Sequence, residues 1–256
     1  MKLYQVVILG IVEGLTEFLP ISSTGHLILT SKILGLTQTE FVKTFQITIQ
    51  VGAILAVLVL NFKTLCNFKT LSKIIIAFLP TAVVGVLVYK FVKKNLLNNY
   101  TIILISLFLG GLLIIIFETF YQKLFKSQNK PQISIKNALI IGLVQTIAFI
   151  PGISRSLATI LGGLALGINR KTIVEFSFLL AIPTILGATV FDLAKTAFSF
   201  SLIELKYILV GFFISFLVAI FALKFFLNYI QKNNFLIFGI YRIFISFLFY
   251  LTKCII

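Results

Sequence analysis

The stretch EGLTEFLPISSTGH, residues 13–26, decides how this chain folds. It lies within an apolar segment, residues 3–29, yet it carries two glutamates, a proline and a string of hydroxyl residues that ends in the only histidine of the chain. Proline interrupts a helix because it has no N–H donor and its ring clashes with the preceding turn. The pattern therefore predicts a short helix, a break and a second short helix within this segment.

A second apolar segment, residues 137–168, has the same organisation, with Gln145, a proline and then a serine-rich string. The two segments match at a constant offset, which places Glu13 opposite Gln145 and Ser22 opposite Ser154. Non-helical backbone at membrane depth is tolerated only where it is buried in protein or lines a cavity. We therefore expect the chemistry at these two breaks, and the match suits a duplicated bundle with one site between its halves.

The composition places both segments in a membrane protein. The chain has 256 residues, of which 59% are hydrophobic and 11% are charged. A soluble domain is roughly 45–50% apolar and about 25% charged. This difference excludes a soluble globular enzyme, a disordered tail and a disulfide-stapled secreted module.

Six further apolar runs are long enough to cross a hydrocarbon core, which takes about 20 helical residues. None alternates as a barrel strand would, so helices are the structure that satisfies the backbone in lipid. We predict an all-α polytopic membrane protein with about six full transmembrane helices and two broken helix pairs. It forms one integral membrane domain, residues 1–256, with pseudo-repeats of roughly 1–118 and 135–256. The six runs are residues 44–60, 74–92, 100–117, 173–191, 207–227 and 235–251.

The net charge is +15, from 22 lysines and arginines against seven acids. The positive electrostatic potential of such a charge attracts anionic substrates or lipid headgroups. The alternative explanation is that cytoplasmic loops of membrane proteins carry excess lysine. No basic stripe interleaved with aromatic residues suggests nucleic-acid binding. Two lysine-rich connections are separated by two full-length helices, so we assign both to the cytoplasmic face. Their lysines are Lys63, Lys69 and Lys73 in one, and Lys123, Lys126, Lys130 and Lys136 in the other. The turn between the two helices also holds lysines, Lys90, Lys93 and Lys94, which weigh against this orientation.

Glu13 and Glu17 are four residues apart, so a helix places both on one face. A charged residue at the centre of a membrane helix costs about 2.5–3.5 kcal/mol on insertion scales. Two carboxylates also repel each other unless a cation lies between them. These costs favour a functional role over a polar stripe that merely faces the bundle. His26 follows two serines and a threonine, and both proton transfer and a hydrogen-bonded structural role are open to it.

Arg155 stands between Ser154 and Ser156, just after a proline–glycine pair in an otherwise apolar segment. A guanidinium flanked by hydroxyls at the start of a helix suits the binding of phosphate oxygens, assisted by backbone N–H groups and the helix dipole. An ion pair with Glu13 or Glu17 is the alternative, and the two roles are compatible. The chain has no P-loop and no zinc motif. Its carboxylates, hydroxyls and guanidinium suit phosphoryl transfer or hydrolysis on an anionic lipid.

At these residues the sequence resembles the bacterial undecaprenyl-diphosphate phosphatase family, which is also known for bacitracin resistance. The motifs that carry the resemblance are EGLTEFLPISSTGH (13–26), PGISRSLAT (151–159), FQITIQVGAILAV (45–57) and EFSFLLAIPTILGA (175–188). The resemblance implies a multi-pass hydrolase of the bacterial plasma membrane that converts the lipid diphosphate to the monophosphate and inorganic phosphate. This reaction recycles the carrier used for peptidoglycan. The resemblance also implies inverted repeats with re-entrant helices, a site that opens toward the outer face and a divalent cation, Mg²⁺ or Ca²⁺.

The resemblance further implies roles for individual residues. The expected catalytic residues are Glu17, Ser23, His26 and Arg155. The expected substrate-binding residues are Ser22, Thr24, Ser154, Ser156 and Thr159. The expected cation ligands are Glu13 and Glu17. One departure is Leu157, where the family usually has glycine. A bulky side chain there is expected to alter how closely the backbone approaches the diphosphate.

Two mechanisms fit these residues. In the first, Ser23 attacks the terminal phosphorus while His26 or Glu17 takes its proton, and a phospho-enzyme is then hydrolysed. In the second, Glu13 and Glu17 hold a cation that helps to position an attacking water. Arg155 holds the developing charge in both. Serine with histidine is slightly preferred at this point.

A transporter is the alternative from another class, for instance a flippase of the same polyprenyl phosphate lipid. Inverted repeats, broken helices and intramembrane glutamates are also transporter traits. A scaffold whose polar residues only join helices is a third hypothesis. A transporter needs charge but no nucleophile, so the two serine-rich strings favour the hydrolase. The lipid and the membrane are the expected partners, nucleic acid is not, and a homodimer is left open.

Overall fold

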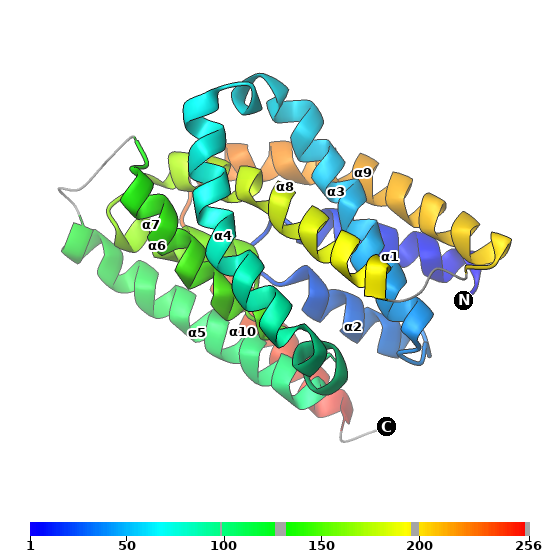
Figure 1. Ribbon diagram of the computed structural model, residues 1–256. Helices are drawn as coiled ribbons and strands as arrows, with labels where there is room; N and C mark the ends of the chain where they lie inside the picture. Colours follow the sequence, from blue (N-terminus) through cyan, green and yellow to red (C-terminus); the bar gives the residue numbers. More distant parts are fainter. Residues whose placement is uncertain (98, 126–131, 196–199, 254–256) are drawn as a thin grey trace.

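The computed structural model describes residues 1–97, 99–125, 132–195 and 200–253, with the backbone alone at 122–125, 252 and 253. Every secondary-structure element in these ranges is a helix (Figure 1). The prediction of an all-α polytopic membrane protein is confirmed. In chain order the helices are α1 (Leu3–Thr16), α2 (Ser23–Ile33), α3 (Glu40–Leu65), α4 (Phe68–Phe91), η1 (Val92–Leu96), α5 (Tyr100–Phe125), α6 (Ile135–Gln145), η2 (Thr146–Phe149), α7 (Arg155–Ala165), α8 (Arg170–Lys195), α9 (Leu202–Ile230) and α10 (Leu236–Lys253).

Both predicted breaks are present. α1 ends at Thr16 and α2 begins at Ser23, and the residues between them include Pro20. In the second segment α6 continues into η2, a 3₁₀ turn that ends at Phe149, and α7 begins at Arg155. Each break leaves backbone groups outside helical hydrogen bonding, and these groups need partners elsewhere in the protein.

Five helices in the described ranges are long and apolar enough to cross a membrane, one fewer than the six predicted. They are α3, the α4–η1 pair, α5, α8 and α9. The sixth predicted run lies in α10, whose apolar part, Leu236–Leu251, is shorter than the other five. Length is the reason for the difference, because a hydrocarbon core takes about 20 helical residues.

The packing of the helices repeats between the two halves of the chain. α1 packs on α9 and, correspondingly, α6 packs on α4; α3 also packs on α9, as α8 does on α4. α3 packs on α8, and α5 packs on α10, across the two halves (Figure 1). A duplicated bundle in which α1–α5 correspond to α6–α10 would give this pattern. The boundaries of the two repeats stay a prediction.

Small residues let the short helices approach their neighbours closely. Gly14 of α1 faces the Ser215 carbonyl of α9, at a position where an added Cβ would lie 2.6 Å from that oxygen. Gly142 of α6 meets the Ala77 carbonyl of α4 in the same way. Helix interfaces in membranes are rich in small residues because close backbone approach replaces the hydrophobic effect there. This packing fixes the helices that lead into the two breaks.

The lysines assigned to the cytoplasmic face lie near the ends of helices. The first set occupies the last turn of α3 and the first two turns of α4. The second connection is described only in part. Lys136 lies in the first turn of α6, Lys123 is described by its backbone alone, and Lys126 and Lys130 lie outside the described residues.

Candidate functional site

The two breaks end in the same unusual way. Ser22 and Ser154 are the N-caps of α2 and α7, and they are the two non-glycine residues of positive φ in the described ranges, at 72° and 77°. Each serine hydroxyl accepts a backbone N–H three residues further on, from Gly25 and from Leu157 respectively. A positive φ at a non-glycine residue costs of the order of 1–3 kcal/mol. It persists only where the surrounding structure holds it, often at functional sites.

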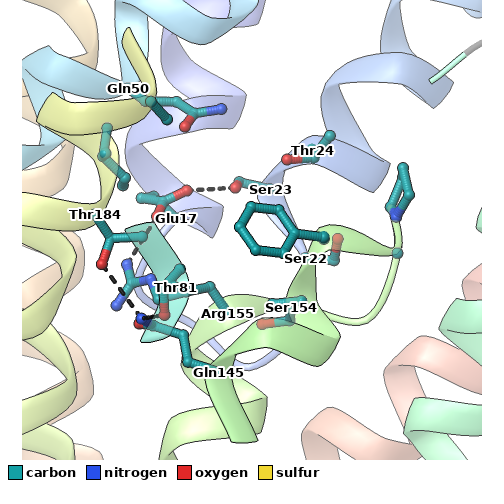
Figure 2. A pocket seen from close by; sticks show the side chains of 16 residues that line it. Glu17, Ser22, Ser23, Thr24, Gln50, Thr81, Gln145, Ser154, Arg155 and Thr184 are labelled. Carbon is teal, nitrogen blue, oxygen red and sulfur yellow. Dashed lines mark hydrogen bonds and ion pairs between the residues drawn. The ribbon is translucent and has the colours of Figure 1, made fainter. Parts of the chain in front are cut away.

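The starts of α2 and α7 meet at one polar cavity of about 150 Å³ (Figure 2). Each of these helices has 11 residues, and a helix dipole places partial positive charge and free N–H groups at its N-terminus. Two N-termini at one cavity suit a phosphate group. The lining residues are Glu17, Ser22, Ser23, Thr24, Gln50, Thr81, Gln145, Ala148, Phe149, Pro151, Gly152, Ser154, Arg155, Thr184, Ile185 and Ala188.

Glu17 connects the hydroxyl of the first break to the guanidinium of the second (Figure 2). The Ser23 hydroxyl donates a hydrogen bond to Glu17 Oε2, and Arg155 Nη2 donates to Glu17 Oε1 at 2.8 Å. Arg155 Nη1 donates to the Ser177 carbonyl of α8 at 2.7 Å, which holds the guanidinium plane. A guanidinium has five N–H donors, so these two bonds leave donors for phosphate oxygens. The ion pair with Glu17 therefore leaves Arg155 with free donors, and phosphate binding by Arg155 stays a prediction.

Glu13 lies one helical turn before Glu17 and is fully buried. The Glu17 N–H donates to the Glu13 carbonyl at 3.0 Å, so the backbone is helical between them and both side chains share one face. Neither carboxylate oxygen of Glu13 accepts a hydrogen bond from a described donor, and the charged group beside it is the Glu17 carboxyl. A buried carboxylate without a partner is costly, and a cation beside it would supply the missing contacts.

The carboxylate pair could hold a divalent cation only together with further ligands. Among the described residues, no group of three or more His, Cys, Asp or Glu side chains could hold a metal ion. Mg²⁺ commonly keeps several waters and uses one or two carboxylates together with substrate phosphates. Glu17 lines the cavity and can supply one carboxylate, and Glu13, which is fully buried behind the lining one helical turn away, is the candidate for the second.

His26 uses both ring nitrogens outside the cavity. Its Nδ1 lies 2.8 Å from the Ser22 carbonyl oxygen, and its Nε2 lies 2.9 Å from the Tyr241 hydroxyl of α10. The imidazole also stacks on the Tyr241 ring, and His26 is not among the lining residues. The preference for His26 as the proton acceptor is therefore not supported, because the Ser23 hydroxyl is bonded to Glu17 instead.

Ser156 and Thr159 lie behind the cavity wall instead of on it. Ser156 is 1% exposed, and its hydroxyl donates to the Leu19 carbonyl at 2.9 Å, which joins the second break to the first. Thr159 is fully buried, and its hydroxyl is 2.7 Å from Ser177 Oγ. Both were expected to bind substrate, but these contacts make them supports for the loop and the helix that carry Arg155.

Leu157 also points away from the cavity. Its side chain is 3% exposed and packs in the main hydrophobic core, and it is absent from the cavity lining. Its N–H donates to Ser154 Oγ at 3.2 Å, as any residue other than proline could at this position. The Leu157 side chain therefore does not itself occupy the space for the diphosphate, and its effect on the approach of the backbone stays a prediction.

Four polar residues of the wall were not among the predicted site residues, and three of them come from helices that the sequence alone does not bring to the site. They are Gln50 of α3, Thr81 of α4, Gln145 of α6 and Thr184 of α8. The Gln145 amide donates to Thr81 Oγ1 at 2.6 Å and to Thr184 Oγ1 at 3.4 Å (Figure 2). The sequence does contain a feature that marks the two threonines: Thr81 and Thr184 each follow a proline inside a long apolar helix. Gln145 also stands opposite Glu13 in the matched segments.

A second, mainly apolar cavity of about 380 Å³ adjoins the polar one. α3, α4 and α8 supply most of its wall, and its far end reaches Lys93 and Asp192, which form an ion pair of 2.6 Å. The two cavities share the lining residues Gln50, Thr81, Phe149, Thr184 and Ala188. The arrangement offers a polar end for an anionic group and an apolar end for a hydrocarbon chain.

The comparison with known proteins covers almost the whole chain. The family described as bacitracin resistance protein BacA matches residues 6–248. A protein of Aquifex aeolicus named undecaprenyl-diphosphatase is 48% identical over 244 residues, which cover 95% of this chain and 95% of that protein. Proteins of the same name from Persephonella marina and Wolinella succinogenes are 49% and 48% identical, with 98% of this chain and 99% of each relative covered. The chain therefore belongs to the bacitracin resistance protein BacA family.

Proposed function

We propose that this chain is an undecaprenyl-diphosphatase of the bacterial plasma membrane, which hydrolyses the lipid diphosphate to undecaprenyl phosphate and inorganic phosphate. The observation that carries the proposal is the bonded set of Ser23, Glu17 and Arg155 at a cavity where two helices begin. Relatives of this name, 48–49% identical over nearly their full length, support the choice of substrate. Release of the monophosphate returns the carrier to cell-wall synthesis, and this recycling links the enzyme to bacitracin resistance.

Ser23 is the proposed nucleophile. Its oxygen attacks the terminal phosphorus, its proton passes to Glu17, and the bond from that phosphorus to the bridging oxygen breaks. Undecaprenyl phosphate then leaves with the proton. In the second step a water attacks the phosphoserine, and the water's proton passes by way of Glu17 to Ser23 Oγ. The bond between phosphorus and Oγ breaks, and inorganic phosphate leaves.

Arg155 and the N–H groups at the starts of α2 and α7 hold the charge of the transferring phosphoryl group. Phosphoryl transfer passes through a loose transition state, so it needs positioning and charge neutralisation more than a strong base. This requirement suits Glu17, whose carboxylate is already paired with Arg155. Glu17 aligns the Ser23 hydroxyl and accepts its proton as the bond to phosphorus forms.

A divalent cation, Mg²⁺ or Ca²⁺, is proposed to bind at Glu13 and Glu17 together with the substrate. When bound, it neutralises negative charge on the diphosphate. The buried oxygens of Glu13, which receive no hydrogen bond from a described donor and lie beside the Glu17 carboxyl, support this role.

The apolar cavity suits the part of the prenyl chain next to the diphosphate. It joins the polar cavity at Gln50, Thr81 and Thr184. A lipid placed across both would have its phosphates at the starts of α2 and α7 and its hydrocarbon against α4 and α8. Ligand sites commonly combine such an apolar wall with a few polar groups that fix orientation.

The site is proposed to open toward the outer face of the membrane. The apolar cavity extends to Lys93 and Leu97, at and beyond the end of α4. Lys69 and Lys73 lie at the opposite end of the same helix, on the face assigned to the cytoplasm. Because α4 with η1 is long enough to cross the membrane, its two ends belong to opposite sides.

Cysteine labelling tests this orientation. Cys66, between α3 and α4, is exposed and is the single thiol of a Cys254→Ser variant. An impermeant maleimide added to intact spheroplasts is expected to leave Cys66 unlabelled. It is expected to label Thr37→Cys in a chain without the native cysteines, because Thr37 is exposed near the opposite end of α3. The reverse labelling pattern would overturn the proposed orientation.

Phosphate release in detergent micelles tests the hydrolase against the transporter. A micelle has no second leaflet, so a flippase forms no product there. The purified protein with Mg²⁺ or Ca²⁺ is expected to release inorganic phosphate and undecaprenyl phosphate in equal amounts from undecaprenyl diphosphate. A folded protein that releases neither would overturn the hydrolase and favour lipid transport.

The same assay, run with and without EDTA, tests whether the reaction needs a divalent cation. EDTA is expected to lower the rate about 10-fold or more, because a metal ion at a phosphoryl group contributes several kcal/mol to the stabilisation of the transition state. Added Mg²⁺ or Ca²⁺ should restore it. A rate that EDTA leaves unchanged would overturn the cation while leaving the hydrolase intact.

A further inference from the structure

Arg242 of α10 is the largest fully buried side chain in the described structure. Its guanidinium donates five hydrogen bonds, which match its five N–H groups, and every acceptor is a backbone carbonyl. The acceptors are Ser106 (3.0 Å) and Leu107 (3.2 Å) of α5, Pro20 (3.1 Å) of the first break, and Gly152 (2.7 Å) and Ile153 (3.2 Å) of the second break.

Three of these bonds join the two breaks through one planar group. Pro20 lies just before the residues that lead into Ser23, and Ile153 lies two residues before Arg155. Carbonyls outside a helix need partners at membrane depth, and the Arg242 guanidinium supplies them on both sides. The separation of the two breaks is therefore limited by the size of a single guanidinium.

α5 holds the guanidinium from a third side. Gly110 leaves the space that it occupies, because a Cβ added at Gly110 would overlap Arg242 Nη2. The carbonyls of Ser106 and Leu107 then accept two of the five bonds. The position of the guanidinium is thus set by α5 as well as by α10.

The other two arginines have carboxylate partners. Arg155 pairs with Glu17, and Arg170 pairs with Glu118, whereas Arg242 forms no ion pair among the described residues. A charged group inside a membrane protein is costly, and the carbonyl bonds offset this cost only while both breaks keep their shape. The burial of Arg242 and the geometry of the breaks therefore depend on each other.

We propose that Arg242 is a positioning residue for the phosphatase reaction: it holds the two breaks at the separation at which Ser23 and Arg155 act on one phosphorus. The inference rests on the proposed function. Arg242 does not line the cavity, so it acts through these two residues and not on the substrate. Lysine cannot replace it, because an ammonium group has three donors at one point and no planar fork.

A double-mutant cycle tests the proposal. Arg242→Lys is expected to lower kcat about 30-fold, since a displacement of 1 Å can cost about 10²-fold. In an Arg155→Lys background the same change is expected to cost less than about 3-fold, because the alignment of Ser23 with Arg155 no longer contributes. A merely structural defect would reduce the active fraction, and kcat with it, by the same factor in both backgrounds.

Arg170→Lys is the matched control, because it also removes the fork of a largely buried arginine, here bonded to both oxygens of Glu118, but at a site outside the cavity. It is expected to lower the stability of the protein while changing the kcat of the folded protein less than about 3-fold. If Arg242→Lys does not fold, Gly110→Ala takes its place in the cycle, because it displaces the guanidinium without removing it. If Arg242→Lys lowered kcat by the same factor in the wild-type and the Arg155→Lys backgrounds, or left kcat unchanged, the positioning role would be overturned. A wild-type protein that releases no phosphate would instead overturn the proposed function itself.

Discussion

Glu17→Gln is expected to lower the kcat of phosphate release by about 10²–10⁴-fold, the usual contribution of a positioned acid–base group. The Glu17 carboxylate accepts hydrogen bonds from both Ser23 and Arg155. Glutamine has the same size but one acceptor oxygen, so its amide N–H₂ must face one of these two donors. The Ser23 hydroxyl loses its proton acceptor or Arg155 loses its partner. The measurement is kcat and KM in micelles.

Glu175→Gln is the matched control for this prediction. Glu175 is a partly exposed residue of α8 whose nearest cation, Lys171, is 4.0 Å away, and its side chain is 43% exposed. Exposed ion pairs contribute about 0–1 kcal/mol, so we expect a change in kcat of less than about 3-fold for this variant. A Glu17→Gln protein that is as active as the control would contradict the role of Glu17.

Ser23→Ala is expected to lower kcat by about 10³-fold or more, as the loss of a covalent nucleophile does in other enzymes. Ser23 is 6% exposed, lines the polar cavity and is bonded to Glu17. Alanine removes the attacking oxygen but leaves the helix N-termini and Arg155 in place. Substrate binding should therefore change little, so the loss is expected in kcat and not in KM.

Ser31→Ala makes the same chemical change on the same helix. Ser31 is fully buried in α2, and its hydroxyl accepts a hydrogen bond from Gln46 at 2.8 Å, away from the cavity. Loss of the Ser31 hydroxyl should lower the free energy of unfolding by about 1–3 kcal/mol and have little effect on kcat. If Ser23→Ala and Ser31→Ala were equally active, Ser23 would not be the nucleophile.

The parts of this fold that follow from local rules are predictable from the sequence. Pro20 and the hydroxyl string after it predict the first break, because proline and N-cap serines act within a few residues. Glu17 and Arg155 stand out for a different reason, since a charge inside an apolar segment is too costly to keep without a role. The matched segments also place Ser22 opposite Ser154, and both turn out to be N-caps of positive φ.

The parts that depend on packing between distant helices are not predictable in this way. Gln50, Thr81 and Thr184 reach the cavity only because α3, α4 and α8 meet there. His26 lies in the most informative motif, yet Tyr241, far along the chain, takes up one of its nitrogens. Motif membership therefore indicates proximity to the site, and the hydrogen-bond partners decide the role.

Arg242 is the strongest example of this limit. In the sequence it is one of three arginines and lies in an apolar run near the end of the chain. Its importance comes from five carbonyl acceptors on three separate segments. Backbone carbonyls carry no sequence signal, so the arginine that joins both breaks is found only in the structure.

The most direct test of the account is to quench the reaction in acid, with undecaprenyl diphosphate that carries radioactive phosphorus in its terminal phosphate. Phosphoserine survives acid, so we predict that label appears on the peptide containing Ser23 within the first turnover. We predict no bound label in Ser23→Ala. Full turnover by the wild-type protein without bound label, together with an undiminished rate in Ser23→Ala, would contradict the account and leave direct attack by water.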